Sequence, residues 1–206
     1  ARKGLGVQVP FRTRILLVVL RTKARKVERM EIAEALALIR AVPDFPIPGI
    51  LFQDIAPLIG NPKAYEAVTK EFGQTETPFN LVAGIESRGF ILASAIAIDS
   101  AVGFVPIRKA GKLPGAVIKR EYGLEYGSDS LEMQIDSLSH VTDPRILLID
   151  DVLATGGTLI AALELIADLA GEVCEVAVLL EISALGGSER INAAFPNLRI
   201  RSLVQI

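Results

Sequence analysis

The sequence is poor in the side chains that form disulfides and metal clusters. Among 206 residues it has one cysteine, Cys174, and one histidine, His140. A single cysteine excludes an intrachain disulfide, and one Cys with one His cannot supply a structural zinc site. We interpret Cys174, which lies in a largely apolar run, as a small buried hydrophobe. We interpret His140, beside a Thr-Asp-Pro turn, as a surface residue.

Long hydrophobic stretches are also missing. The apolar run at residues 15–20 is far shorter than the roughly 20 residues that a membrane-spanning helix needs. It is also short for the core of a signal peptide, and no clear small-residue cleavage site follows it. We therefore expect no membrane association and a cytoplasmic protein.

Positive charge is scarce outside the first 29 residues. Those residues hold nine of the 22 Lys and Arg and one acid, Glu28, so residues 30–206 carry 13 basic and 23 acidic side chains. An acidic body of this kind is not typical of a nucleic-acid binder. The basic leader could be an organelle transit peptide or translated upstream sequence. We favour the second, because Met30 begins a new helical pattern. We expect residues 1–29 to lie outside the fold and residues 30–206 to form a single domain.

Half of the residues are hydrophobic and few are aromatic, a composition typical of an α/β protein with a buried parallel sheet. Strands alternate with helices from residue 81 onward, which favours a parallel sheet with right-handed crossovers. Residues 108–130 are rich in Gly, Lys and Tyr and indicate a mobile excursion, such as a hairpin. The predicted strands are 81–84, 102–107, 145–149, 173–180 and an edge strand at 199–204. The predicted helices are 31–41 (ended by Pro43), 62–73, 87–98 and 157–169, with an extended segment at 44–52.

The segment IDDVLATGGT, residues 149–158, carries the strongest chemical signal. A buried strand delivers two adjacent carboxylates, Asp150 and Asp151, and a small-residue turn then leads into a helix. Backbone N–H groups at a glycine turn and a helix start bind phosphate well. The carboxylates would repel that phosphate and are better placed to accept hydrogen bonds from ribose hydroxyls or to help hold Mg²⁺. The segment therefore predicts a site for a sugar 5-phosphate. It is neither a Walker loop nor a Rossmann fingerprint.

This segment resembles the PRPP-binding motif of type I phosphoribosyltransferases, where PRPP is phosphoribosyl pyrophosphate. Four more segments resemble adenine phosphoribosyltransferases in the family's order: DFPIPGILFQDIAPL (44–58), GIESRGF (84–90), IRKAGKLPG (107–115) and LEYG (124–127). The resemblance spans residues 44–158. It implies the type I fold: a central parallel sheet flanked by helices, a small N-terminal hood at about residues 30–60, and a flexible catalytic loop.

The resemblance also implies a role for each segment. The 5-phosphate of PRPP would bind Ala154, Thr155, Gly156, Gly157 and Thr158, while Asp150 and Asp151 would serve the ribose and Mg²⁺. Pyrophosphate would bind Glu86, Ser87, Arg88, Arg108, Lys109 and Lys112, and Arg108 could act across a dimer. The family tends to place a non-proline cis peptide in the first of these segments, so we expect one at Glu86–Ser87.

Two further segments would complete the site. Glu125 would be the catalytic residue at N7 of adenine, either as general acid in one direction or by holding the proton being relayed, with Tyr126 shaping the closed site. Adenine would bind at Leu51, Phe52 and Gln53, where Phe52 can stack on the purine. Gln53 replaces the basic residue common in the family, which bears on base specificity.

The implied activity is purine salvage: adenine and PRPP give AMP and pyrophosphate, with Mg²⁺ and without a dedicated protein-only metal site. A homodimer is expected from the resemblance. Two alternatives remain. One is a phosphoribosyltransferase for xanthine or another base, against which the 44–58 and LEYG segments argue. The other is a PRPP-sensing regulator, which would normally carry an added nucleic-acid-binding domain that residues 1–29 are too short to form.

Overall fold

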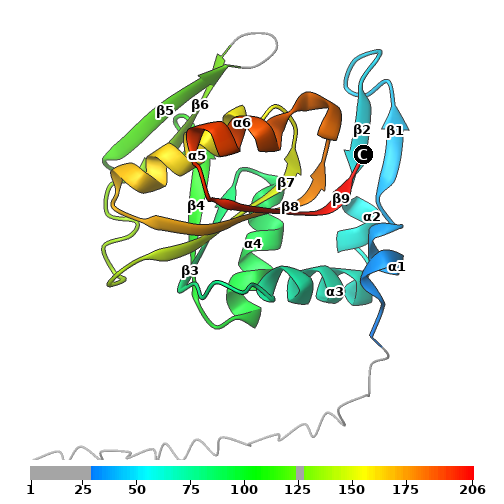
Figure 1. Ribbon diagram of the computed structural model, residues 1–206, viewed down its shortest axis with the longest axis horizontal. Helices are drawn as coiled ribbons and strands as arrows, with labels where there is room; N and C mark the ends of the chain where they lie inside the picture. Colours follow the sequence, from blue (N-terminus) through cyan, green and yellow to red (C-terminus); the bar gives the residue numbers. More distant parts are fainter. Residues whose placement is uncertain (1–28, 124–127) are drawn as a thin grey trace, which may run out of the picture.

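The computed structural model describes residues 29–123 and 128–206. Residues 1–28 of the leader, and the predicted Glu125 and Tyr126, lie outside these described residues. The described strands form one seven-stranded sheet, in the order β5-β6-β4-β3-β7-β8-β9, and a separate two-stranded sheet of β1 and β2 (Figure 1). The division into a leader and one domain stays a prediction.

The core of the large sheet is parallel, as predicted. Strands β4, β3, β7, β8 and β9 run in one direction, and β5 and β6 form an antiparallel hairpin beside β4. The predicted edge strand near the C-terminus is β9. The strands are β3 (Leu81–Ile85), β4 (Gly103–Lys109), β5 (Val117–Gly123), β6 (Ser128–Gln134), β7 (Arg145–Leu153), β8 (Glu172–Glu181) and β9 (Arg199–Gln205).

Both faces of the parallel part of this sheet are buried. Successive side chains of a strand point to opposite faces, so each strand contributes to two apolar clusters. In β7, Ile146 and Leu148 belong to one apolar cluster, and Leu147 and Ile149 belong to the other. Helices α5 and α6 cover the first face, and α1 to α4 cover the second (Figure 1). The helices are α1 (Ile32–Leu36), α2 (Ala56–Ile59), α3 (Pro62–Gly73), α4 (Arg88–Asp99), α5 (Gly157–Asp168) and α6 (Gly187–Ala194), with a 3₁₀ turn at Ser183–Leu185.

The N-terminal helix is shorter than predicted. Helix α1 ends at Leu36, and β1 (Arg40–Pro43) then pairs with β2 (Leu51–Asp54). Pro43 therefore ends a strand and not a helix. Residues 37–41 have helical spacing, but pairing across the hairpin competes with it: Arg40 lies opposite Asp54 and forms an ion pair with it. Tertiary pairing has overridden a weak local preference here.

Most of the other boundaries follow the prediction. Helix α3 begins at Pro62, where the Asn61 side chain accepts hydrogen bonds from the N–H groups of residues 63 and 64. The excursion at 108–130 contains the β5–β6 hairpin. Strand β7 continues four residues beyond the predicted end at Ile149, to Leu153. Helices α2 and α6 were not predicted. Cys174 is buried and His140 is exposed, as expected.

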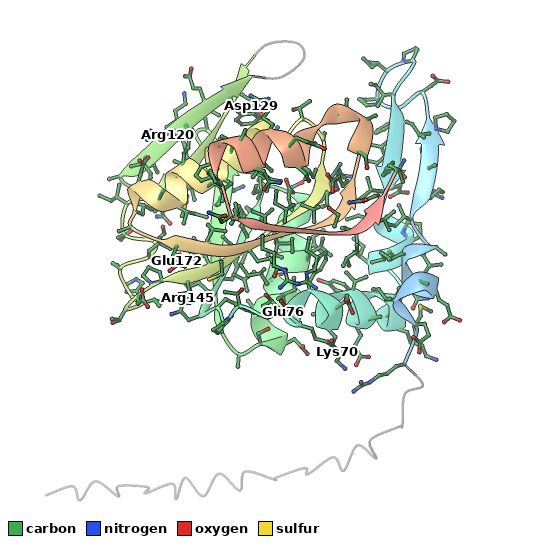
Figure 2. The ribbon with its side chains drawn as sticks, in the orientation of Figure 1. Lys70, Glu76, Arg120, Asp129, Arg145 and Glu172 are labelled. Carbon is green, nitrogen blue, oxygen red and sulfur yellow. The ribbon has the colours of Figure 1, made fainter. Side chains whose placement is uncertain are left out.

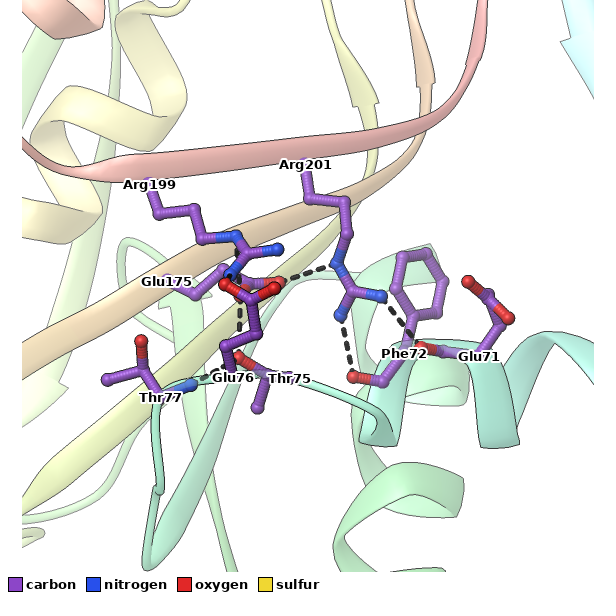
Figure 3. A network of polar contacts seen from close by, with 8 residues as sticks. All are labelled: Glu71, Phe72, Thr75, Glu76, Thr77, Glu175, Arg199 and Arg201. Carbon is purple, nitrogen blue, oxygen red and sulfur yellow. Dashed lines mark hydrogen bonds and ion pairs between the residues drawn. The ribbon is translucent and has the colours of Figure 1, made fainter.

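A buried ionic cluster ties the edge strand β9 to the end of α3 (Figure 3). Glu175, at 0% exposure, accepts hydrogen bonds from Arg201 Nε at 2.6 Å and from Thr75 Oγ1 at 2.6 Å. Arg201 also donates to the last carbonyls of α3, those of Glu71 and Phe72. One guanidinium thus neutralises a buried carboxylate and caps a helix C-terminus.

The longest of the described helices have 12 residues. Within residues 29–123 and 128–206, none combines the length and the apolar character needed to cross a membrane.

Candidate functional site

Charged and polar residues gather at the carboxyl ends of three strands. Strand β3 lies between β4 and β7, parallel to both, and the chain reaches β4 on one side before it reaches β7 on the other. Ligands of open α/β sheets bind in the crevice at such a reversal of strand order. A cavity of about 520 Å³ opens there, lined by Glu86, Ser87, Arg88, Lys109, Tyr122, Asp129, Asp150, Asp151, Val152, Ala154 and Thr158.

The turn from β7 into α5 presents free backbone donors. Gly156 is the N-cap of α5 and has φ of 81°, a left-handed conformation that favours glycine. Among the described residues, the N–H groups of Thr155, Gly156, Gly157 and Thr158 have no hydrogen-bond partner. Buried or half-buried amides normally find an acceptor. Four such donors at a helix start are suited to an anion. The predicted 5-phosphate site at this turn stays a prediction.

The paired carboxylates lie inside the last part of β7. The strand delivers both carboxylates near its C-terminal end, as predicted, but pairing with β8 continues past the predicted end at Ile149 to Leu153. Asp150 and Asp151 are 8% and 6% exposed. Burial raises the pKa of Asp150 well above its ordinary value, and repulsion from Asp151 raises it further. Burial also raises the pKa of Asp151, although the Arg88 guanidinium opposes that change. Both groups are suited to a ligand that brings hydroxyl donors or positive charge.

Arg88, the first residue of α4, connects the β1–β2 hairpin to the sheet. Its Nη2 atom lies 2.8 Å from Asp151 Oδ2, and its Nη1 atom donates to the Gln53 carbonyl at 3.1 Å. Its guanidinium carbon lies 4.9 Å from the ring centre of Phe52, a cation–π distance. The contact with Asp151 is an ion pair and not an aligned hydrogen bond, so the buried Oδ2 atom has no hydrogen-bond partner within residues 29–123 and 128–206.

In the predicted pyrophosphate site, the basic residue Arg108 is paired with the acid Glu86. Arg108 donates to both Glu86 oxygens at 3.2 Å, and the backbone N–H of Lys109 donates to the same carboxylate at 3.1 Å. The hydrogen bonds from Arg108 are the main reason that the pKa of Glu86 is lowered. The Glu86–Ser87 peptide is cis, which confirms the expectation. Lys112 is exposed and contributes its carbonyl to Arg108, so its predicted role stays untested.

Three residues that line the cavity were not predicted from the sequence: Val152 and two polar residues, Tyr122 and Asp129. Asp129 Oδ2 lies 2.9 Å from Lys109 Nζ and accepts a hydrogen bond from the Tyr122 hydroxyl at 3.3 Å. The Lys109 ammonium is the main reason that the pKa of Asp129 is lowered. Asp129 lies on the β5–β6 hairpin (Figure 2), and it stands directly opposite Tyr122 in the strand register. The sequence indicated a hairpin, but only its register brings these two side chains together at the cavity.

The predicted adenine-binding residues lie on β2, beside the cavity. Leu51 is 53% exposed, and Phe52 and Gln53 are half-buried. The Phe52 ring packs edge-on against Phe45, with ring centres 5.0 Å apart. These residues do not line the 520 Å³ cavity, and Arg88 is their link to it. Adenine binding on this strand stays a prediction.

The side chains of the site offer few ligands for a divalent metal ion. No group of three or more His, Cys, Asp or Glu side chains within the described ranges could hold a metal ion by itself. The Oδ2 atom of Asp151, which has the Arg88 ion pair but no hydrogen bond among the described residues, and the adjacent Asp150 carboxylate offer the oxygen ligands that Mg²⁺ prefers. The residues therefore fit an ion that takes most of its ligands from a phosphorylated substrate and water.

The described site joins free amide donors, two buried carboxylates and a second, cation-bearing turn at one crevice. Together with the parallel sheet, these features define a phosphoribosyltransferase. A family model described as "Phosphoribosyl transferase domain" matches residues 60–195.

Relatives and solved structures narrow the class. The chain is 47% identical over 169 residues to the adenine phosphoribosyltransferase of Prochlorococcus marinus (strain MIT 9313), covering 81% of this chain and 95% of the relative. It is 44% identical over 182 residues to the enzyme of that name from Streptomyces galbus, covering 87% and 99%. The Giardia lamblia enzyme, solved in complex with 9-deazaadenine, superposes with a TM-score of 0.78 at 43% identity, covering 86% of this chain and 98% of that one. The chain thus belongs to the adenine phosphoribosyltransferase family. The sequence-based predictions of the fold and of a glycosyltransferase are confirmed.

Proposed function

We propose that the cavity at the ends of β3, β4 and β7 is where this enzyme joins adenine to the ribose of PRPP. The overall reaction is that of its family: adenine and PRPP give AMP and pyrophosphate in purine salvage. One observation carries the assignment of the site. Four backbone N–H groups with no partner in the described part of the chain lie next to two buried carboxylates, an arrangement that suits a 5-phosphate next to ribose hydroxyls.

Each group of the substrate would bind the site residues whose charge or hydrogen-bonding groups complement it. The 5-phosphate would bind the amides of residues 154–158, and the ribose hydroxyls would donate to Asp150 and Asp151. The pyrophosphate would bind the Glu86–Arg88 turn, with Arg108, Lys109 and Lys112 neutralising it. The Glu86 side chain is occupied by Arg108, so this residue would serve through its backbone. Lysine has three N–H donors, so Lys109 can keep Asp129 and still bind phosphate.

The chemistry is a substitution at C1 of the ribose. Adenine N9 attacks C1 with inversion while pyrophosphate leaves, and the protein contributes positioning and charge stabilisation. Mg²⁺, when bound with PRPP, supplies positive charge to the leaving pyrophosphate. Glu125 holds or relays the proton at N7, and Tyr126 shapes the site around it. Adenine would stack on Phe52 and be recognised by backbone groups of Leu51 and Gln53.

A homodimer located in the cytoplasm completes the proposal. Both parts rest on the family resemblance. Size-exclusion chromatography with light scattering measures the mass directly: a single 22.1 kDa species would contradict the dimer.

A spectrophotometric assay with PRPP and Mg²⁺ tests the function, with adenine, hypoxanthine, guanine and xanthine offered separately. We expect AMP from adenine alone. Glu125→Gln should lower kcat by about 10²- to 10⁴-fold. The matched control is Glu121→Gln, because Glu121 is an exposed acid on β5 that pairs with Lys119 away from the cavity. Binding of PRPP without turnover of any base would favour a regulator. Turnover of another base would show that the pocket around Gln53 is misassigned.

A further inference from the structure

The first turn of α6 lies directly against the backbone of residues 154–156. A Cβ atom on Gly187 would lie 2.3 Å from the Ala154 carbonyl oxygen and 2.6 Å from Leu153 Cδ1. In the other direction, a Cβ on Gly156 would lie 2.9 Å from the Gly187 carbonyl oxygen. The two backbones are therefore in contact, with no room for a side chain at Gly187. The requirement for glycine here is one of space.

This contact fixes the direction of the phosphate-loop amides. The Ala154 carbonyl faces Gly187, and the Thr155 carbonyl accepts a hydrogen bond from Arg190 Nη1 at 3.4 Å. In a planar trans peptide, the next N–H points opposite to the carbonyl. The N–H groups of Thr155 and Gly156 therefore point away from α6. They belong to the four donors without a partner among the described residues, and the neighbouring Ala154 lines the cavity.

A buried carboxylate holds this turn of α6 to the sheet. Ser188 Oγ donates to Glu181, the last residue of β8, which also accepts from Ser202 Oγ at 2.6 Å and Gln205 Nε2 at 3.2 Å. Burial alone would raise the pKa of Glu181, but these three hydrogen bonds outweigh it and lower the pKa. Glu181 stays ionised and gives Ser188 a strong, charge-assisted anchor.

We propose that Gly187 is a positioning residue for 5-phosphate binding, held in place by Ser188 and Glu181. It acts through the loop: its missing side chain lets two loop carbonyls pack against α6, which turns the following amides toward the phosphate. Arg190 holds the second carbonyl. The inference rests on the proposed function, since it takes residues 154–158 to be the 5-phosphate site.

The test compares Gly187→Ala with Gly171→Ala. A Cβ at Gly171 would also crowd its neighbours, at 2.8 Å from Ile166 Cγ2 and Leu138 Cδ1, but Gly171 precedes β8 at the opposite end of the sheet from the site. We expect both variants to lower Tm. Only Gly187→Ala should weaken AMP binding in calorimetry, by about tenfold or more, because small displacements of binding groups are costly. Pyrophosphate binds the other end of the proposed substrate site, so its inhibition constant should change by less than about twofold.

The outcomes separate the claims. If Gly187→Ala has a lower Tm but binds AMP as tightly as wild type, the inference is overturned and the proposed function stands. A wild-type protein that binds no AMP would overturn the proposed function and this role with it. If Gly187→Ala does not fold, Ser188→Ala and Arg190→Met decide. Each should weaken AMP binding by about threefold, roughly the value of one hydrogen bond, and unchanged affinity in both would reject the role.

Discussion

The guanidinium of Arg88 lies 2.8 Å from the carboxylate of Asp151, and this pair joins the start of α4 to the end of β7. A cation at a helix N-terminus opposes the helix dipole, so the carboxylate compensates an unfavourable placement. The same guanidinium reaches the Gln53 carbonyl and the Phe52 ring. The proposed pyrophosphate, ribose and adenine subsites therefore meet at one side chain.

Arg88→Lys should raise KM for both PRPP and adenine, by about tenfold each. An ammonium is a single donor centre and cannot bind Asp151, bind the Gln53 carbonyl and cover Phe52 at the same time. Steady-state kinetics with each substrate varied in turn measures this. Arg120→Lys is the control, since Arg120 on β5 pairs with Asp168 at the end of α5 and does not line the cavity. A rise in KM for PRPP alone would show that Arg88 does not support the adenine subsite.

Asp150→Asn should stabilise the protein at neutral pH while it lowers activity. A carboxyl whose pKa is raised by folding contributes stability below its ordinary pKa of 3.8 and loses it as the pH rises through the folded value. At pH 7 the folded wild type therefore loses stability, either to a buried charge or to the uptake of a proton, and Asn has neither cost. A gain of about 1 kcal/mol corresponds to a Tm increase of about 2–4 °C for a chain of this size.

Thermal melts across pH test the sign of this effect. The gain in Tm should be largest near pH 7 and should vanish below pH of about 4, where Asp150 is protonated in both folded and unfolded protein. Asp99→Asn, at the exposed end of α4, serves as the control. A gain that stays constant with pH would show that the charge of Asp150 is not its source.

Arg201→Met should lower the free energy of unfolding by about 3 kcal/mol, because it leaves the buried Glu175 carboxylate without its main partner. It also removes two donors from the end of α3. Chemical denaturation measures the change, and KM values should stay near those of wild type. Arg199→Met, on the same strand but 3.4 Å from Glu175 and more exposed, should cost less. Equal losses in the two variants would contradict a central role for Arg201.

Local signals in the sequence anticipated much of the fold. Alternating apolar runs and helical patterns predicted β3, α4, β7, α5 and β8, because burial on both faces imposes apolar strands. The predicted helix from 31 to 41 was wrong in its second half. There Arg40 pairs with Asp54 across the β1–β2 hairpin, a contact that no local pattern reveals. Helix α6 was missed because it is short, largely polar and begins with glycine, a poor helix former.

The sequence by itself determined the family, the glycine turn proposed to bind phosphate and the paired acids of this protein. These features are short contiguous segments whose chemistry follows from residue type and spacing. Only the tertiary structure decided which residues meet: Asp129 with Lys109 and Tyr122 through the hairpin register, and Gly187 with the loop at Ala154 through the packing of α6. Such contacts join segments far apart in the chain, and close packing fixes them when the sheet and its helices assemble.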